Sequence, residues 1–219
     1  MKQLILAAAA AIAVAGCHSA PQTPSNANGE SAQTTSARSS PSGTSFGGYP
    51  DQVSWGKHLV QMSGCGDCHT PKVMSPMGPV PDTTMYLAGH PSQIPPPRIN
   101  RAEIEKQGLM LTNDLTVWIG PWGISYAANL TPDETGIGGW TEAQFIRAIR
   151  EGKWKGMENS RSLLPPMSFV AASLNQVAND EELKAIFAYL KTIKPVHNLV
   201  PGPEAPLHQA QHAHSAAQF

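Results

Sequence analysis

The clearest amphipathic pattern of the chain lies around residue 186. Apolar side chains recur there at helical spacing: Leu183, Ile186, Phe187, Leu190 and Ile193. Asn179 precedes this run and Glu182 follows it by three positions, which is a capping-box pattern. Pro195 cannot continue a helix. The pattern therefore predicts a helix that starts after Asn179 and ends before Pro195.

A second helix is predicted to begin after Thr141. Thr141 can act as the N-cap, and Gln144 stands at the third helical position, where it completes a capping box. Trp140 and Phe145 have the spacing of a hydrophobic staple. Gly152 suits the end of this helix.

A third helix is expected from Asp51 to Met62, with an apolar face and a glycine, Gly56, in its interior. Glycine lowers helix stability, so it either is merely tolerated or allows a close crossing with another helix. The last helix offers Phe187 or Tyr189 as the contact for Gly56. Both explanations of Gly56 remain open from the sequence.

The segments between these helices are rich in proline and glycine. Residues 71–97 contain eight prolines, which excludes long helices there. Residues 98–125 contain short apolar runs that can make a hairpin, and residues 163–167, Leu-Leu-Pro-Pro-Met, are expected to form a stiff loop.

The two ends of the chain differ from its centre. Residues 1–16 combine Lys2 with an apolar, alanine-rich run, as in a secretory signal that is too short to span a bilayer well. Residues 17–48 are dominated by small and polar residues and predict a flexible linker. Residues 201–219 predict a disordered tail, and its histidines are expected to be solvated.

Composition limits the possible functions. The chain has 219 residues, a formal net charge of −1, 14% charged residues, 20 prolines and 19 glycines. This suits one loop-rich domain of ordinary size. A near-neutral charge gives no support for a nucleic-acid partner.

The strongest chemical signal is Cys65-Gly66-Asp67-Cys68-His69, which has the C-x-x-C-H spacing of a covalent haem c site. Two thiols on one helical turn can each bond a haem vinyl group, and His69 can then supply the proximal ligand to iron. A redox C-x-x-C pair needs no following histidine and usually lies in a βαβ pattern. A zinc site needs a second ligand pair, and no cysteine follows Cys68.

The third cysteine, Cys17, ends the run Val14-Ala15-Gly16-Cys17, which resembles a bacterial lipobox. The resemblance implies cleavage before Cys17 and acylation of this residue, hence a lipid anchor. An ordinary signal with an incidental cysteine is the alternative. Export and haem c agree with each other, because bacteria attach haem c outside the cytoplasmic membrane.

The sixth ligand of the iron decides what such a haem does. The methionines after His69 are Met74, Met77, Met85, Met110, Met157 and Met167. Met167 is favoured because the Pro-Pro-Met loop precedes a helix that must fold back on the helix before Cys65. His90 and His197 are the alternatives, each expected to be a surface or loop histidine.

Several motifs together resemble class I c-type cytochromes, and more closely the modules in cytochrome subunits of periplasmic alcohol and gluconate dehydrogenases. The matching stretches are CGDCHTP at 65–71, NLTPD at 129–133, GIGGW at 136–140, FIRAIREG at 145–152, PPM at 165–167 and YLKTIKPV at 189–196. The resemblance implies an all-α, cytochrome c-like helical domain over residues 49–200, with long Pro/Gly-rich loops. It also implies thioethers at Cys65 and Cys68, His69 as proximal ligand and Met167 as distal ligand. Unlike those subunits, this chain has one C-x-x-C-H module.

These features predict a one-electron carrier with one covalent haem c and no enzymatic activity of its own, held by a lipid anchor at the periplasmic face of a bacterial membrane. Its expected partners are redox proteins: a dehydrogenase, a quinol-oxidising complex or a terminal oxidase. The alternatives are a haem enzyme or sensor (peroxidase or gas-binding) with an open or labile sixth position, and a structural lipoprotein with an incidental haem.

Two finer expectations concern the haem surroundings. The carbonyl of Pro79 is a candidate acceptor for the proximal His69 ring, and a plain turn role for Pro79 is the alternative. Arg98, Arg147 and Arg150 are candidates for haem propionates, with Arg147 and Arg150 favoured by the family resemblance.

Overall fold

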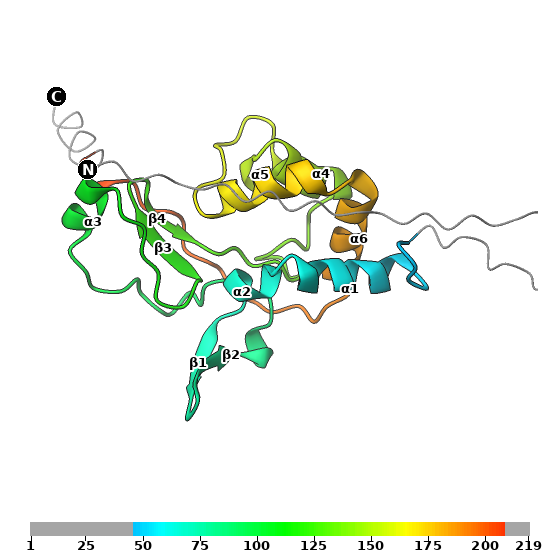
Figure 1. Ribbon diagram of the computed structural model, residues 1–219, viewed down its shortest axis with the longest axis horizontal. Helices are drawn as coiled ribbons and strands as arrows, with labels where there is room; N and C mark the ends of the chain where they lie inside the picture. Colours follow the sequence, from blue (N-terminus) through cyan, green and yellow to red (C-terminus); the bar gives the residue numbers. More distant parts are fainter. Residues whose placement is uncertain (1–45, 209–219) are drawn as a thin grey trace, which may run out of the picture. The chain divides into compact units, whose positions relative to one another are not determined.

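The computed structural model describes residues 46–208 (Figure 1). Every element described below lies within these residues. The predicted signal segment, Cys17, nearly all of the linker and the last eleven residues lie outside the described part. Within residues 46–208, no helix has the length and apolar character needed to cross a membrane.

Six α-helices, two short 3-10 helices and four strands make up the described part. The α-helices are α1 (Gln52–Met62), α2 (Cys65–His69), α3 (Arg101–Gln107), α4 (Glu142–Arg150), α5 (Met167–Val177) and α6 (Asp180–Leu190). The 3-10 helices are η1 (Thr83–Met85) and η2 (Trp154–Gly156), and the strands are β1 (Lys72–Ser75), β2 (Gly78–Pro81), β3 (Val117–Gly120) and β4 (Gly123–Tyr126).

The crossing of α1 with α6 is the main helix contact, and it explains Gly56. A Cβ atom built on Gly56 would lie 2.5 Å from the carbonyl carbon of Ala185 and 2.9 Å from Cβ of Tyr189. The close-crossing explanation is therefore confirmed, with Tyr189 and not Phe187 as the side chain that faces Gly56. The backbone of Ala185 is the nearest neighbour of Gly56, and the sequence did not indicate it.

The two capping boxes predicted from the sequence are both present. Thr141 caps α4 with Gln144, and Asn179 caps α6 with Glu182. Gly152 follows α4 with a left-handed φ of +60°. Helix α6 ends at Leu190, earlier than Pro195 alone requires.

The helical core lies where α1, α4 and α6 meet. Its buried members are Val60, Leu87, Ile137, Phe145, Ile149, Leu183, Ile186, Phe187 and Leu190. The rings of Phe145 and Phe187 pack with their centroids 5.4 Å apart, which joins α4 to α6. The apolar faces read from the sequence therefore do form one core.

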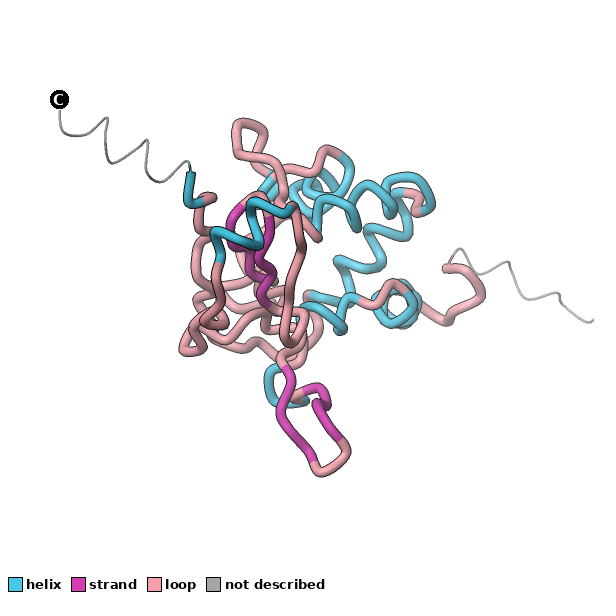
Figure 2. Tube along the Cα trace, turned by 60° about the vertical axis from the view of Figure 1, so that its left-hand side comes forward, coloured by secondary structure: helices cyan, strands magenta, loops and turns pink. Residues whose placement is uncertain are grey.

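The expectation of an all-α fold is wrong, because the chain also forms two antiparallel two-stranded sheets (Figure 2, magenta). Strands β3 and β4 form the hairpin that the apolar runs of residues 98–125 suggested, joined by a two-residue turn. Its buried side chains, Val117, Ile119 and Ile124, make a second small core. Strands β1 and β2 form a further hairpin within the proline-rich segment. Prolines exclude helices there, but they are tolerated in a short two-stranded sheet, in which each strand is an edge strand.

Helices α3 and α5 also went unpredicted. Helix α3 is short and carries no buried residue, so it has no clear apolar stripe. Helix α5 contains no charged residue, has no side-chain cap and starts at Met167, inside the segment expected to be a loop. Residues 201–208, assigned to a tail, contact the β3–β4 hairpin: the backbones of Glu204 and Ile124 exchange two hydrogen bonds.

Candidate functional site

The Cys-x-x-Cys-His motif forms α2, a single helical turn directly after α1. Gly64 connects the two helices in the left-handed conformation, with φ of +64°, which suits glycine. The amide of Asp67 then bonds the carbonyl of Gly64 at 3.0 Å. The side chains of Cys65 and Cys68 are three positions apart on this turn, so they share one face of it.

Both thiols of α2 are half-buried and form no disulfide. Burial raises the pKa of Cys65 to about 11, and burial also raises the pKa of Cys68. Redox-active C-x-x-C pairs have a lowered thiol pKa, so this pair lacks the character of a thiol–disulfide catalyst. Within residues 46–208 no three His, Cys, Asp or Glu side chains are grouped to hold a metal ion.

The ring of His69 is buried, with 9% of its surface exposed, and its orientation is set by one hydrogen bond. Nδ1 donates to the carbonyl oxygen of Ala128 at 2.7 Å. A carbonyl only accepts, so Nδ1 carries the proton and Nε2 carries a lone pair. Burial lowers the pKa of His69, which favours this neutral form. Nε2 makes no hydrogen bond to any residue in the range 46–208, which leaves it available as a ligand.

The proposal that the carbonyl of Pro79 accepts the hydrogen bond from His69 is therefore wrong. Pro79 lies in β2, opposite Met74 of β1. The true acceptor, Ala128, follows β4, and it went unrecognised because any residue type supplies a backbone carbonyl.

The loop of residues 87–90 holds α2 against the segment that follows β4. The amide of Gly89 donates to the carbonyl of His69 at 2.8 Å, and the amide of His90 donates to the carbonyl of Ala127 at 2.9 Å. Gly89 has φ of +77°, and a Cβ there would lie 2.5 Å from the oxygen of Ala127, so only glycine fits. Asn198 supports the same loop with bonds to the carbonyls of Ala88 and His90.

These residues fit a covalently attached haem by their own chemistry. Cys65 and Cys68 offer two protonated thiols on one turn, and His69 offers a neutral imidazole whose Nε2 is unbonded while Nδ1 is anchored. This is the donor set of a c-type site, in which a second hydrogen bond fixes the tautomer of the proximal histidine.

Met167, the predicted distal ligand, is the first residue of α5 and packs half-buried against the helical core. The hydroxyl of Ser125 in β4 donates to the carbonyl of Pro165 at 2.6 Å, which ties the Pro-Pro-Met segment to the hairpin. By contrast, Met74 and Met77 are 80% and 97% exposed. The assignment of Met167 as iron ligand remains a prediction.

The two histidine alternatives differ in their surroundings. His90 lies in a loop, as expected, but it is buried there, and its Nδ1 and Nε2 pair with Thr116 Oγ1 and the carbonyl of Ile94, each at 2.8 Å. Neither ring nitrogen of His90 is available to a metal in this arrangement. His197 is exposed, and its Nδ1 lies 3.4 Å from a carboxylate oxygen of Asp133.

The three arginines proposed for haem propionates also have different environments. Arg98 is exposed. Arg147 donates to the carbonyl of Gly156 at 3.2 Å. Arg150 donates to Asp180 at 2.7 Å and to the carbonyl of Ala178 at 2.7 Å, so it joins α4 to the α5–α6 connection. The guanidinium of Arg150 is thus already paired.

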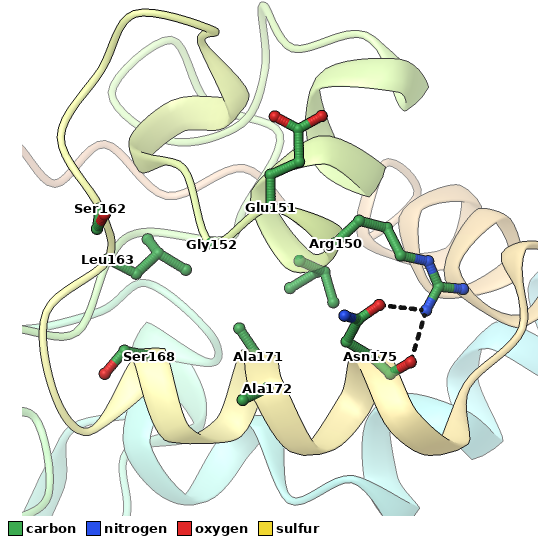
Figure 3. Close-up of a pocket in the computed structure, with 10 residues that line it drawn as sticks. Arg150, Glu151, Gly152, Ser162, Leu163, Ser168, Ala171, Ala172 and Asn175 are labelled. Atoms are coloured by element: carbon green, nitrogen blue, oxygen red, sulfur yellow. Dashed lines mark hydrogen bonds between the residues drawn. The ribbon is translucent and has the colours of Figure 1, made fainter.

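A small hollow of about 260 Å³ lies between the end of α4 and α5 (Figure 3). Arg150 and Asn175 are joined by hydrogen bonds at one end of this hollow, and apart from Glu151 the remaining lining is small or apolar, as with Leu163 and Ala171. The lining of this hollow contains none of the three motif side chains of α2.

Comparison with known proteins gives partial matches. No family model matches the chain. The chain is 42% identical over 82 residues to a subunit of the nicotinate dehydrogenase of Pseudomonas putida, covering 37% of this chain and 6% of that protein. It is 35% identical over 86 residues to the gluconate 2-dehydrogenase cytochrome c subunit of Pantoea cypripedii, covering 39% of this chain and 17% of that protein. The chain thus matches only a small part of the length of each relative.

Proposed function

We propose that this chain is a monohaem c-type cytochrome that carries single electrons. Cys65 and Cys68 form the two thioether bonds, His69 is the proximal ligand and Met167 is the distal ligand. The observation that carries the proposal is the bond from His69 Nδ1 to the carbonyl of Ala128 at 2.7 Å. It holds the neutral tautomer whose Nε2 can bind iron, on the helical turn that bears both thiols.

Each residue has a separate task. A bound haem c supplies reversible Fe(III)/Fe(II) chemistry. The thiols of α2 hold the porphyrin covalently, and the Ala128 carbonyl orients the ring of His69 and increases its basicity. The thioether of Met167 would supply the second protein ligand to the iron and would raise the reduction potential. A haem held by both His69 and Met167 would exchange an electron without binding a substrate at the metal.

Covalent attachment is tested with the full chain, produced together with a haem c maturation system. After denaturation and acid–acetone extraction, the haem should stay with the wild-type polypeptide. It should be extractable from the double variant Cys65→Ser/Cys68→Ser. Cys17→Ser is the matched control, because it removes the third thiol and should retain covalent haem. Extractable haem in the wild type would refute the proposal.

The distal ligand is tested by the spectra of Met167→Ala. The wild type should show the low-spin His/Met signature in its ferric and ferrous optical and magnetic spectra, and the variant should lose it. Met77→Ala is the control, because Met77 is 97% exposed at the tip of the β1–β2 hairpin. An unchanged Met167→Ala spectrum would exclude Met167 as ligand and would favour the haem enzyme or sensor alternative.

The cellular setting of the proposal rests on the first residues of the sequence. The apolar run before Cys17 supports export, and acylation of Cys17 would tether the domain to the periplasmic face of the membrane through about 30 linker residues, with a reach of roughly 30 Å. The names of the two relatives support a dehydrogenase as electron donor. Cys17→Ser should move the protein from the membrane fraction to the soluble fraction. Unchanged membrane association would contradict the proposed lipid anchor but not the proposed haem site.

A further inference from the structure

One short stretch of backbone, residues 125–128, contacts both segments that carry the proposed iron ligands. Ser125 bonds the carbonyl of Pro165, two residues before Met167, at 2.6 Å. Three residues later, the carbonyl of Ala128 accepts the bond from His69 Nδ1 at 2.7 Å. Three residues of extended chain span about 10 Å, so the end of one strand is bonded both to the ring of His69 and to the segment that precedes Met167.

The direction of each bond at Ser125 is fixed by its partners. Trp122 Nε1 lies 3.1 Å from Ser125 Oγ, and an indole nitrogen can only donate. The carbonyl of Pro165 can only accept. Hence the hydroxyl of Ser125 accepts from Trp122 and gives its one proton to Pro165. Ser125 is 8% exposed, so a water molecule cannot easily replace its hydrogen bond to Pro165.

The hairpin makes Ser125 a firm point of attachment. Ser125 lies in β4 opposite Trp118 of β3, and the amide of Ala127 bonds the carbonyl of Thr116 at 2.8 Å beyond the end of the ladder. The neighbouring side chains Val117, Ile119 and Ile124 are buried in the small hairpin core.

The acceptor of the Ser125 hydrogen bond, the carbonyl of Pro165, also lies in a constrained segment. Pro165 and Pro166 have restricted backbones, and Pro166 is the N-cap of α5, whose first residue is Met167. The amide of Val170 bonds the carbonyl of Pro166 at 3.2 Å, so α5 continues rigidly from this point. Holding the carbonyl of Pro165 therefore limits how far the Met167 thioether can move.

From these contacts we infer that Ser125 is a positioning residue that keeps Met167 in place and so controls whether the sixth position is closed or open to an added ligand. The inference rests on the proposed function, because it takes Met167 as the distal ligand. Ser125 acts through the Pro165 carbonyl and does not itself touch the metal.

The test is the affinity of the ferric holoprotein for imidazole, a probe that must displace Met167 to bind. Ser125→Ala removes the donor to Pro165 and should increase the apparent affinity about 2- to 10-fold, the range that one net hydrogen bond provides. Ser125→Thr keeps a hydroxyl and should stay near wild type. Ser75→Ala is the matched control, because Ser75 donates to the carbonyl of Gly78 at 2.7 Å in the other hairpin.

A double-mutant cycle separates positioning from general loosening. In the Met167→Ala background there is no ligand to displace, so adding Ser125→Ala should leave the imidazole affinity unchanged. A Ser125→Ala effect that persists in this background would overturn the inference, as would an equal effect of Ser75→Ala or a Ser125→Ala affinity within 1.5-fold (roughly the limit of one weak bond) of wild type.

The outcomes for the two proposals are distinguishable. If Met167→Ala leaves the wild-type spectrum unchanged, the ligand assignment fails and the inference fails with it. If Met167→Ala removes the His/Met signature while Ser125→Ala binds imidazole like wild type, the cytochrome proposal stands and only the role of Ser125 is refuted. Far-UV circular dichroism of each variant identifies any that is unfolded. If Ser125→Ala is unfolded, the imidazole affinity of Ser125→Thr is compared with that of the wild type instead.

Discussion

Gly56 gives the sharpest test of how the domain is held together, because two effects of opposite sign act there. Replacing Gly56 by alanine favours α1 locally by about 0.5–1 kcal/mol, since glycine is a poor residue inside a helix. The same methyl group would lie 2.5 Å from the carbonyl carbon of Ala185 and 2.9 Å from Cβ of Tyr189. Because the first neighbour is backbone, α1 and α6 must move apart by about 1 Å.

The loss of packing is the larger effect. A radial gap of 0.5–1 Å already forfeits about a quarter to a half of the dispersion energy across a contact. The α1–α6 contact includes four fully or nearly buried side chains, namely Val60, Leu183, Ile186 and Leu190. At about 2 kcal/mol each, these four side chains contribute about 8 kcal/mol. Losing a quarter to a half of this contribution costs about 2–4 kcal/mol. After the gain in helix propensity, Gly56→Ala should lower the free energy of unfolding by about 1–3 kcal/mol.

Urea unfolding of the holoprotein, followed by far-UV circular dichroism, measures this change. Gly139→Ala is the control, because a Cβ there meets no atom within 4 Å and Gly139 has no left-handed φ. The control should lie within about 0.5 kcal/mol of wild type. A Gly56→Ala variant as stable as wild type, or more stable, would refute the close crossing of α1 and α6.

Three further substitutions test other parts of the domain by the same unfolding measurement. Asn179→Ala removes the α6 cap and should cost about 0.5–2 kcal/mol; a smaller loss would mean that α6 does not depend on its capping box. Asn198→Ala leaves two buried carbonyls and one amide without their partner, so it should lower the free energy of unfolding by about 3 kcal/mol or more. A loss below about 1 kcal/mol would mean that water replaces the lost hydrogen bonds. The hydroxyl and amide of Thr135 hold the pKa of Asp133 below its usual value of 3.8. The stabilisation by Asp133 is therefore present above pH 3.8 and is lost as the pH falls through the lower folded-state pKa, so Asp133→Asn should be less stable than wild type at pH 6 and closer to it at pH 2. An equal difference at both pH values would contradict this role.

The proposed haem site shows how far reasoning from sequence reaches. Cys65, Cys68 and His69 could be proposed from sequence because their spacing in one helical turn is itself the chemical requirement of a haem c site. The candidate acceptor for His69, Pro79, was wrong, because a backbone carbonyl has no sequence signature and Ala128 lies 59 positions away. Ser125 was missed for the same reason, as its partner is the carbonyl of Pro165.

The fold shows the same division. The helices with an N-cap, a capping box and an apolar stripe, α4 and α6, were located from sequence because all their signals are local. The all-α assignment failed because the chain forms two short hairpins, of which only β3–β4 was suggested by apolar runs. The strands carry few residues each, and their stability depends on contacts that the sequence does not display. One such contact is the pairing of Glu204 with Ile124 across the end of the β3–β4 hairpin.

By itself, the sequence determined the placing of two thiols and a histidine on one helical turn, the capped starts of α4 and α6, and the presence of a glycine that permits a close crossing, since each depends on residues within about five positions of one another. Only the tertiary structure decided which backbone carbonyl orients His69 and which strand holds the segment of Met167. Both depend on hydrogen bonds between groups 40 or more positions apart, and backbone groups are the same at every residue.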